Sequence, residues 1–277
     1  MILVKSHGLG NDYLVVHEAS FPLTAGAARL LCDRHWGVGG DGVLEPVPSA
    51  VATAGLRIWN PDGSQAEKSG NGLRIYARYL VDHRGAPPEL SIEVASGVVR
   101  CQVDPDGVTV EMGRATLEPA EIPTTERLRR SPVQVGEQTL HVCAVGMGNP
   151  HCVVWRDDDL DALPWRAWGQ ALEVDRRFPN RTNVQFARVR GPDALEARIW
   201  ERGAGETAAS GSSACAVAVS AVVLGLVSAR DLRVQMSGGA LRVQVSAGLD
   251  VTLRGPVEET AQIRLASAWE KKLMVTG

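Results

Sequence analysis

Two short turns rich in serine, glycine and asparagine carry the side chains best placed to do chemistry. One covers residues 69–72 (Ser-Gly-Asn-Gly) and the other covers residues 210–213 (Ser-Gly-Ser-Ser). Each precedes a helical pattern, so unpaired backbone N–H groups would lie at the positive end of a helix dipole. Such a helix start can bind a carboxylate or a phosphate, although serine and asparagine there are also ordinary N-caps. We therefore expect two candidate anion sites, each beside a serine hydroxyl.

The two turns belong to an internal repeat. Residues 57–60 (Arg-Ile-Trp-Asn) return 141 positions later as residues 198–201 (Arg-Ile-Trp-Glu), and a Ser-Gly pair follows each at the same spacing. Residues 8–13 and 96–103 also have counterparts, which begin at positions 146 and 237. Four matches in one order predict a duplicated fold with two similar halves. If the halves face each other, Ser69 and Ser210 would approach one carbon from opposite sides.

The elements that must position these turns are short strands and about two helices in each half. Runs rich in Val and Ile, bounded by Gly, Pro or Asp, predict strands. The predicted strands are 12–17, 90–95, 98–103, 107–112, 152–155, 196–200, 232–236 and 241–245. The predicted helices are 24–35, which opens at Thr24, and then 71–83, 158–173 and 211–226.

The repeat also predicts the domain boundaries. We expect a first domain of residues 1–117, to which a tail at 263–277 returns, and a second domain of residues 118–262. Residues 114–124 contain two prolines and little periodicity. This segment is the best candidate for a linker between the domains.

Composition excludes several classes of protein. Hydrophobic residues make up 44% and charged residues 22% of the chain, as in ordinary globular proteins. A net charge of −3 without a basic run argues against a nucleic-acid-binding protein. No apolar run is long enough to span a bilayer, and the N-terminus lacks a secretory pattern. Five cysteines without CxxC spacing predict reduced thiols in the cytoplasm, with no metal site and no disulfides.

Five motifs resemble those of the diaminopimelate epimerase family. In chain order they cover residues 7–13, 60–64, 69–74, 148–151 and 201–207. The resemblance implies an α+β fold of two pseudo-symmetric domains, each with a mixed sheet wrapped around a central helix. It also implies an epimerase of lysine and peptidoglycan biosynthesis that binds a small amino acid. Such an enzyme needs no pyridoxal phosphate, metal or other cofactor, and a homodimer is an open expectation.

The resemblance implies that catalysis belongs to one residue in each half. The family has a cysteine at each position, whereas this chain has Ser69 and Ser210. A thiol ionises near a pKa of about 8.5, and a hydroxyl near the value of about 15.7 for water. The difference corresponds to roughly 10 kcal/mol for forming the anion. We therefore predict very slow turnover, or none, unless a neighbouring base activates a serine.

The substrate-binding positions keep the family's residue types. Arg202 can pair with a carboxylate and Glu201 with an ammonium group. Gly42 stands where the family usually has glutamine, and His151 is a possible ionisable helper beside the reacting centre. The complete set of expected substrate contacts is Asn11, Asn60, Gly70, Asn71, Asn149, Asn183, Glu201, Arg202, Gly211 and Ser212.

Three interpretations stay open from the sequence. The first is a diaminopimelate epimerase, or a close homologue, that works through Ser69 and Ser210. The second is an isomerase of the same fold whose proton shuttle is Glu201 and His151. The third is a non-catalytic amino-acid-binding protein. Exchange of the substrate's α-proton with heavy water distinguishes the first two from the third.

Overall fold

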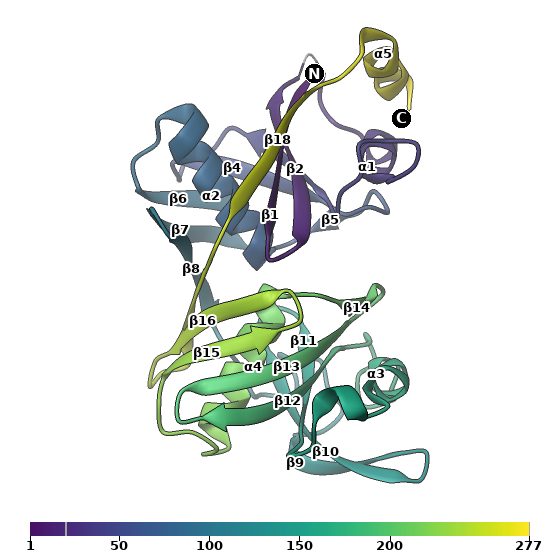
Figure 1. The fold of residues 1–277 in the computed structure, drawn as a ribbon, viewed down its shortest axis with the longest axis vertical. Coiled ribbons are helices and arrows are strands. Elements are labelled where there is room, and N and C mark those ends of the chain that lie inside the picture. The colour runs from purple at the N-terminus through teal and green to yellow at the C-terminus, as the bar shows by residue number, and fades with distance from the viewer. Residues whose placement is uncertain (20, 277) are drawn as a thin grey trace. The chain divides into compact units, whose positions relative to one another are not determined.

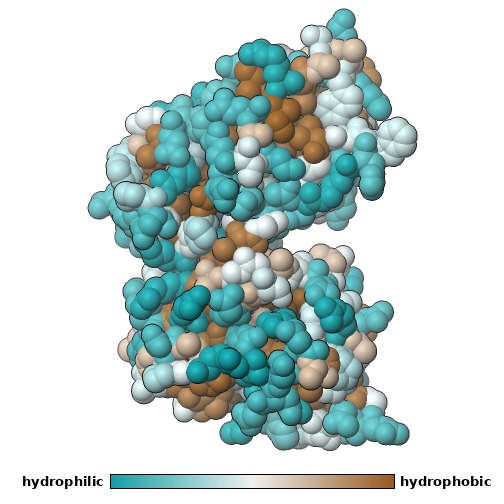
Figure 2. Space-filling model, in the orientation of Figure 1, coloured by the Kyte–Doolittle hydropathy of each residue, from teal (hydrophilic) through white to brown (hydrophobic). Residues whose placement is uncertain are grey.

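The computed structural model describes residues 1–19 and 21–276, which form two compact units (Figure 1). Unit 1 consists of Met1–Val110 and Gly255–Gly277, and unit 2 is Glu111–Arg254. Within the described residues, no helix is both long and apolar enough to cross a membrane. Figure 2 shows mainly hydrophilic residues on the visible face of each unit, as expected for a chain with 22% charged residues.

The sheet of unit 1 is mixed. Strands β2 and β3 pair in parallel, as do β4 and β6, while the other neighbours are antiparallel. In order of pairing, the strands are β18 (Glu258–Arg264), β1 (Ile2–Gly8), β2 (Asn11–Glu18), β3 (Val43–Val47), β4 (Ala54–Trp59), β6 (Glu89–Val94), β7 (Gly97–Asp104) and the start of β8 (Gly107–Arg114). The short β5 (Gln65–Ala66) pairs with the end of β4.

The helices described in unit 1 are α1 (Ala25–Cys32), α2 (Gly70–Arg84) and α5 (Ser267–Val275). Helix α2 begins after Ser69, whose side chain caps it, and ends at Gly85 in the left-handed conformation that glycine adopts readily. Its residues from Gly70 to Ala77 are buried, so α2 lies inside the unit. Helix α5 buries Leu273 in the same apolar cluster as residues of α1.

The sheet of unit 2 repeats this topology. Strands β11 and β12 pair in parallel, as do β13 and β15, and the other neighbours are antiparallel. The strands are β9 (Arg129–Val135), β10 (Gln138–Gly146), β11 (Pro150–Trp155), β12 (Asn183–Gly191), β13 (Ala194–Glu201), β15 (Asp231–Met236), β16 (Gly239–Val245) and β17 (Asp250–Gly255), and the short β14 (Gly205–Thr207) pairs with β13. The α+β fold with two pseudo-symmetric domains is therefore confirmed.

Helix α4 (Gly211–Val223) is the counterpart of α2 in unit 2. Its small and β-branched residues are buried continuously from Ser213 to Ala221, as expected for a central helix. The predicted helix at 158–173 is wrong in its first part. There the chain forms a short 3₁₀ helix, Leu160–Ala162, and α3 (Trp165–Glu173) starts after Pro164. Proline has no N–H and restricts the residue before it, so it favours a helix start at this point.

The strand registers define which residues are counterparts. Val43 pairs with Trp59 in unit 1, and Val184 pairs with Trp200 in unit 2. On the neighbouring strands, Leu14 pairs with Val43 and Cys152 pairs with Val184. It follows that the preceding residues correspond as well: Tyr13 with His151, and Gly42 with Asn183.

The segment expected to be a linker is packed instead. Ile122 is buried in the apolar core of unit 2, and Thr116 forms a bridge with Gly146. The two prolines of this segment lie in turns, and the N–H of Thr124 donates to the carbonyl of Pro119. The division between units 1 and 2 instead falls within β8, after Val110.

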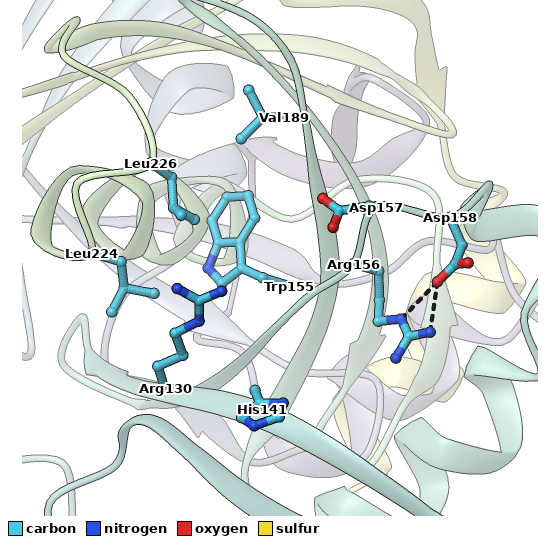
Figure 3. Close-up of a pocket in the computed structure, with 9 residues that line it drawn as sticks. All are labelled: Arg130, His141, Trp155, Arg156, Asp157, Asp158, Val189, Leu224 and Leu226. Carbon is cyan, nitrogen blue, oxygen red and sulfur yellow. Dashed lines mark hydrogen bonds and ion pairs between the residues drawn. The ribbon is translucent and has the colours of Figure 1, made fainter.

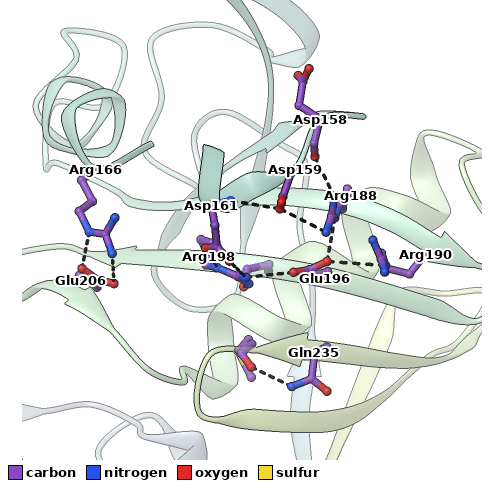
Figure 4. A network of polar contacts seen from close by, with 12 residues as sticks. Asp158, Asp159, Asp161, Arg166, Arg188, Arg190, Glu196, Arg198, Glu206 and Gln235 are labelled. Atoms are coloured by element: carbon purple, nitrogen blue, oxygen red, sulfur yellow. Dashed lines mark hydrogen bonds and ion pairs between the residues drawn. The ribbon is translucent and has the colours of Figure 1, made fainter. Parts of the chain in front are cut away.

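A network of ion pairs lies along β12 and β13 (Figure 4). Arg198 donates to both carboxylate oxygens of Asp161 at 2.7 Å and to Glu196 at 3.0 Å. Arg166 of α3 donates to both oxygens of Glu206 in β14. Single surface ion pairs contribute only about 0–1 kcal/mol, but paired donors also fix geometry. The network therefore positions β13, which ends at Glu201.

Candidate active site

Ser69 is the centre of the first group of candidate residues, which we call half-site 1. Its Oγ accepts a hydrogen bond from the N–H of Gly72 at 3.0 Å, the ordinary geometry of an N-cap. The hydroxyl of Tyr13, at the start of β2, lies 3.1 Å from the same oxygen. Two polar groups therefore contact Ser69 Oγ at the positive end of α2.

Asn11 and Asn71 are joined by a hydrogen bond in half-site 1. The Nδ2 of Asn71 donates to Oδ1 of Asn11 at 2.9 Å, and Nδ2 of Asn11 donates to Asp41 at 2.8 Å. Arg74 lies at the other end of this series of hydrogen bonds. It is fully buried and donates to Oδ1 of Asn71 at 2.6 Å. These bonds fix the orientation of both amides, as a preorganised binding site requires.

Charged residues surround the position of Asn11, which donates to Asp41. Arg34 donates to Asp12 and Asp41 at 2.7 Å each, and Nζ of Lys5 lies 3.0 Å from Asp12. Burial alone would raise the pKa of Asp12, but the hydrogen bonds and charges of Arg34 and Lys5 outweigh it and lower the pKa. Asp12 is therefore ionised at neutral pH and joins Arg34 and Lys5 to the start of β2.

Asn60 and Gly42 have local structural roles in half-site 1. Asn60 follows β4, and its side chain donates to Oγ of Ser64 at 2.9 Å within a turn. A Cβ on Gly42 would lie 2.5 Å from Cε1 of Tyr13 and 2.7 Å from the carbonyl oxygen of Trp59. The ring of Tyr13 therefore fills the space that a side chain at position 42 would need.

Ser210 is the centre of the second group, half-site 2. It is the N-cap residue of α4, with φ −141° and ψ 125°, close to the φ −139° and ψ 119° of Ser69. Within the described part of the chain, the Ser210 side chain makes no cap hydrogen bond with α4. Gly211 and Ser212 follow as the first residues of the helix. The backbones of the two serines match, but their side-chain contacts do not.

His151 is held between two amides in half-site 2. Its Nε2 donates to Oδ1 of Asn149 at 2.8 Å, and Nε2 of Gln185 donates to its Nδ1 at 3.0 Å. The same nitrogen of Gln185 donates to Ser213 at 3.0 Å. Burial lowers the pKa of His151 to about 3, so the ring is neutral at neutral pH. A buried imidazole with both nitrogens bonded is a poor proton shuttle, which argues against that role.

Asn183, Glu201 and Arg202 lie together near the end of β13. Asn183 accepts from the backbone N–H of Arg202 at 3.0 Å and donates to the carbonyl of Pro150 at 3.1 Å. Glu201 accepts from the hydroxyl of Thr207 at 2.8 Å. The guanidinium of Arg202 donates to the carbonyl of Asn180 at 3.1 Å. Glu201 and Arg202 are thus consecutive acidic and basic residues whose side chains contact different neighbours, Thr207 and Asn180.

Comparison with known proteins shows the family of this chain. The family model for diaminopimelate epimerase matches residues 3–118 and 143–258, one segment in each half of the repeat. The chain belongs to the diaminopimelate epimerase family. It is 44% identical over 275 residues to diaminopimelate epimerase from Desulforudis audaxviator, covering 94% of this chain and 97% of that one. It is 41% identical to diaminopimelate epimerase 2 from Nostoc sp., covering 96% of each chain.

Solved structures share the fold of this family member. The hydroxyproline epimerase from Agrobacterium vitis, solved with bound trans-4-hydroxy-L-proline, has a TM-score of 0.69 at 17% identity and covers 96% of this chain and 92% of its own. The phenazine biosynthesis protein of the PhzF family from Bacillus anthracis has a TM-score of 0.69 at 15% identity, with coverages of 96% and 99%. At these identities the likeness shows the fold alone.

Several contacts in this family member were not expected from its sequence. Tyr13 beside Ser69 is the main one, and Asp41, Arg74 and Gln185 hold the candidate asparagines and histidine in place. Tyr13 ends the motif at residues 7–13, and Gln185 is a polar residue inside an apolar strand. Both signals are visible in the sequence, but only the fold reveals which side chains they contact.

A cavity of about 740 Å³ in unit 2 is a separate feature (Figure 3). Trp155, Leu224 and Leu226 form an apolar part of its wall, and Arg156 donates to Asp158 nearby. Its nine lining residues differ from those of half-site 2. This cavity therefore does not mark the candidate residues.

Proposed function

We propose that the protein binds a diaminopimelate-like amino acid and inverts its α-carbon by proton transfer at Ser69 and Ser210. The observation that carries this proposal is the matched position of the two serines. Each is the N-cap residue of the central helix of its unit, with nearly the same backbone conformation. In this proposal the two half-sites act on opposite faces of one carbon.

The surrounding groups support recognition of an amino acid with charges at both ends. The starts of α2 and α4 offer backbone N–H groups to the carboxylate next to the reacting carbon. Arg202 can pair with the distal carboxylate, and Glu201 with the distal ammonium group. These contacts need no thiol, so binding is independent of the change from cysteine to serine.

Catalysis in this proposal is slow because the acids and bases are hydroxyls. The roughly 10 kcal/mol difference between forming an alkoxide and forming a thiolate corresponds to about seven decades of rate when fully expressed. Measurable proton exchange therefore requires a neighbouring group that accepts the serine proton.

Exchange of the α-proton in heavy water tests the proposal. The protein is incubated with diaminopimelate in D₂O, and loss of the α-proton signal is followed by NMR. We expect slow exchange that the Ser69→Ala/Ser210→Ala variant lacks, whereas Ser91→Ala, a serine whose Oγ bonds Thr53, retains it. Binding without exchange would favour an amino-acid-binding protein, and neither binding nor exchange would reject the site.

The cellular setting is part of the same proposal. Cys32, Cys101, Cys143, Cys152 and Cys215 are buried and form no disulfide among the described residues, which supports a reducing compartment such as the cytoplasm. Burial raises the pKa of the Cys32 thiol to about 12. Association as a homodimer is also proposed, and light scattering of the purified protein tests it.

A further inference from the structure

The hydroxyl of Tyr13 contacts the atom that the proposed function requires to accept a proton. Tyr13 Oη and Ser69 Oγ are 3.1 Å apart, a hydrogen-bond distance in which either group can donate. Tyr13 is only 7% exposed, so its ring has little room to move away from this contact. Ser69 Oγ therefore lies between the phenol and the N–H of Gly72.

The backbone around Tyr13 is shaped to admit its ring. A Cβ at position 42 would lie 2.5 Å from Cε1 of Tyr13, closer than any real contact, so only glycine fits beside the ring there. In unit 2 the counterpart of Gly42 is Asn183, which carries a side chain, and the counterpart of Tyr13 is His151. The contact between a phenol and an N-cap serine thus belongs to half-site 1.

We propose that Tyr13 is the proton acceptor for Ser69, which makes Ser69 able to remove the α-proton of the amino acid. This inference rests on the proposed function and identifies the proton acceptor that Ser69 requires there. Because Tyr13 acts through Ser69, it is a positioning residue rather than one that touches the substrate.

The proposed step conserves atoms and charge. The phenolate oxygen of Tyr13 takes the proton from the Ser69 hydroxyl, while Ser69 Oγ forms a new O–H bond with the α-hydrogen. The Cα–H bond breaks, and its electron pair stays on the carbon and spreads into the adjacent carboxylate. The negative charge has then moved from the phenolate to the substrate, and Ser69 is again a neutral hydroxyl.

A phenol is suited to this task because it ionises far more readily than an alcohol. The ordinary difference between a tyrosine and an aliphatic hydroxyl is about six decades in acidity. The N–H of Gly72 and the dipole of α2 stabilise negative charge on Ser69 Oγ during the transfer. Tyr13 therefore lowers the barrier at Ser69 without converting it into a thiol.

The substitution Tyr13→Phe removes only the hydroxyl and tests the proposal. The α-proton exchange of diaminopimelate in D₂O is measured for the full chain across pH 6 to 10. We expect exchange by the unmodified protein to rise with pH, and Tyr13→Phe to reduce it at least about tenfold and flatten the rise. Tyr79→Phe is the matched control, because the Tyr79 hydroxyl contacts His17 and Arg84 instead.

A second background separates proton transfer from a purely structural effect. A thiol ionises without the help of Tyr13, so Tyr13→Phe should reduce exchange less than about threefold when Ser69→Cys is also present. An equal loss in both backgrounds would mean that the hydroxyl only supports the fold. That result, or an unchanged rate in Tyr13→Phe alone, would overturn the proposal.

The same measurements distinguish this inference from the proposed function. If the unmodified chain shows no exchange but Ser69→Cys/Ser210→Cys does, the site is correctly placed and Tyr13 does not activate Ser69. If neither protein exchanges the proton nor binds diaminopimelate, the proposed function itself fails, and this inference fails with it.

Discussion

Tyr13 and His151 occupy the same strand position in the two units but make different kinds of contact. Tyr13 directs its hydroxyl to the N-cap residue Ser69. His151 is bonded to Asn149 and to Gln185, which in turn contacts Ser213 inside α4. Duplication preserved the backbone that holds each serine, while the polar groups around the serines diverged. Ser69 is in contact with an ionisable side chain, Tyr13, whereas among the described residues no such contact is found at Ser210, so the two half-sites are unequal.

The largest effect should come from restoring thiols. Ser69→Cys/Ser210→Cys is expected to increase α-proton exchange at least about a thousandfold, because thiolates form far more readily than alkoxides. The comparison also predicts that Ser210→Cys alone accelerates inversion more than Ser69→Cys alone, since Ser69 already has Tyr13. Chiral chromatography measures inversion and NMR measures exchange. Equal gains from the two single variants would contradict the inequality of the half-sites.

His151 should make the stability of unit 2 depend on pH. Its pKa is lowered to about 3 from 6.5, so the unfolded chain binds a proton below pH 6.5 that the folded chain does not. Stability is complete above that pH and falls as the pH drops toward 3. Between pH 7.5 and 4.5 the loss should be about 2.5 kcal/mol.

Denaturant unfolding at the two pH values measures the loss due to His151. His151→Gln should lose less stability between the two pH values than the unmodified protein. His141→Gln, at an exposed position, should lose as much as the unmodified protein. A pH dependence that is identical in all three proteins would show that His151 is not held neutral by the fold.

Gly42→Ala tests whether the Tyr13 ring fills the space beside position 42. The added Cβ would meet Cε1 of Tyr13 at 2.5 Å, so we expect a destabilisation of about 2 kcal/mol and slower exchange. Gly40→Ala is the control, because its nearest contact would be an ordinary 3.4 Å to Leu14. Thermal unfolding compares the two variants. Similar melting temperatures would mean that Tyr13 can move without loss.

The smallest expected effect concerns recognition in half-site 2. Arg202→Ala should weaken binding of diaminopimelate by about 1.5 kcal/mol or more, because a hydrogen bond to a charged group is lost. Arg176→Ala, an exposed arginine of the same unit, is the control. Calorimetry measures both. If Arg202→Ala binds as tightly as the control, the distal carboxylate is held elsewhere.

Much of the fold could be predicted because its signals are local or repeated. The predicted helices at 71–83 and 211–226 correspond to α2 and α4, and the repeat predicted that Trp59 and Trp200 lie in equivalent strands. The error at residues 158–163 arose because helical periodicity extends across Pro164, which starts a new helix. Each of these signals spans only a few residues or one fixed offset.

The surroundings of the candidate site could not be predicted in the same way. Tyr13 and Ser69 are separated by 56 positions, and their contact depends on how α2 packs beside β2. Likewise, His151 and Gln185 meet because β11 and β12 pair in parallel across 34 positions. A single sequence shows residue types at such distances but not which side chains touch.

Unit 1 is built from segments at both ends of the chain, and this determines the order in which the two units can fold. Unit 2 is one continuous stretch, so it can complete its sheet while later residues are still being synthesised. Unit 1 must wait for β18, which pairs with β1, and for α5, whose Glu270 pairs with the amino group of Met1 at 2.6 Å. During synthesis, β1 is left with an open edge until the last strand arrives. Unit 1 is therefore completed last, although most of its residues are made first.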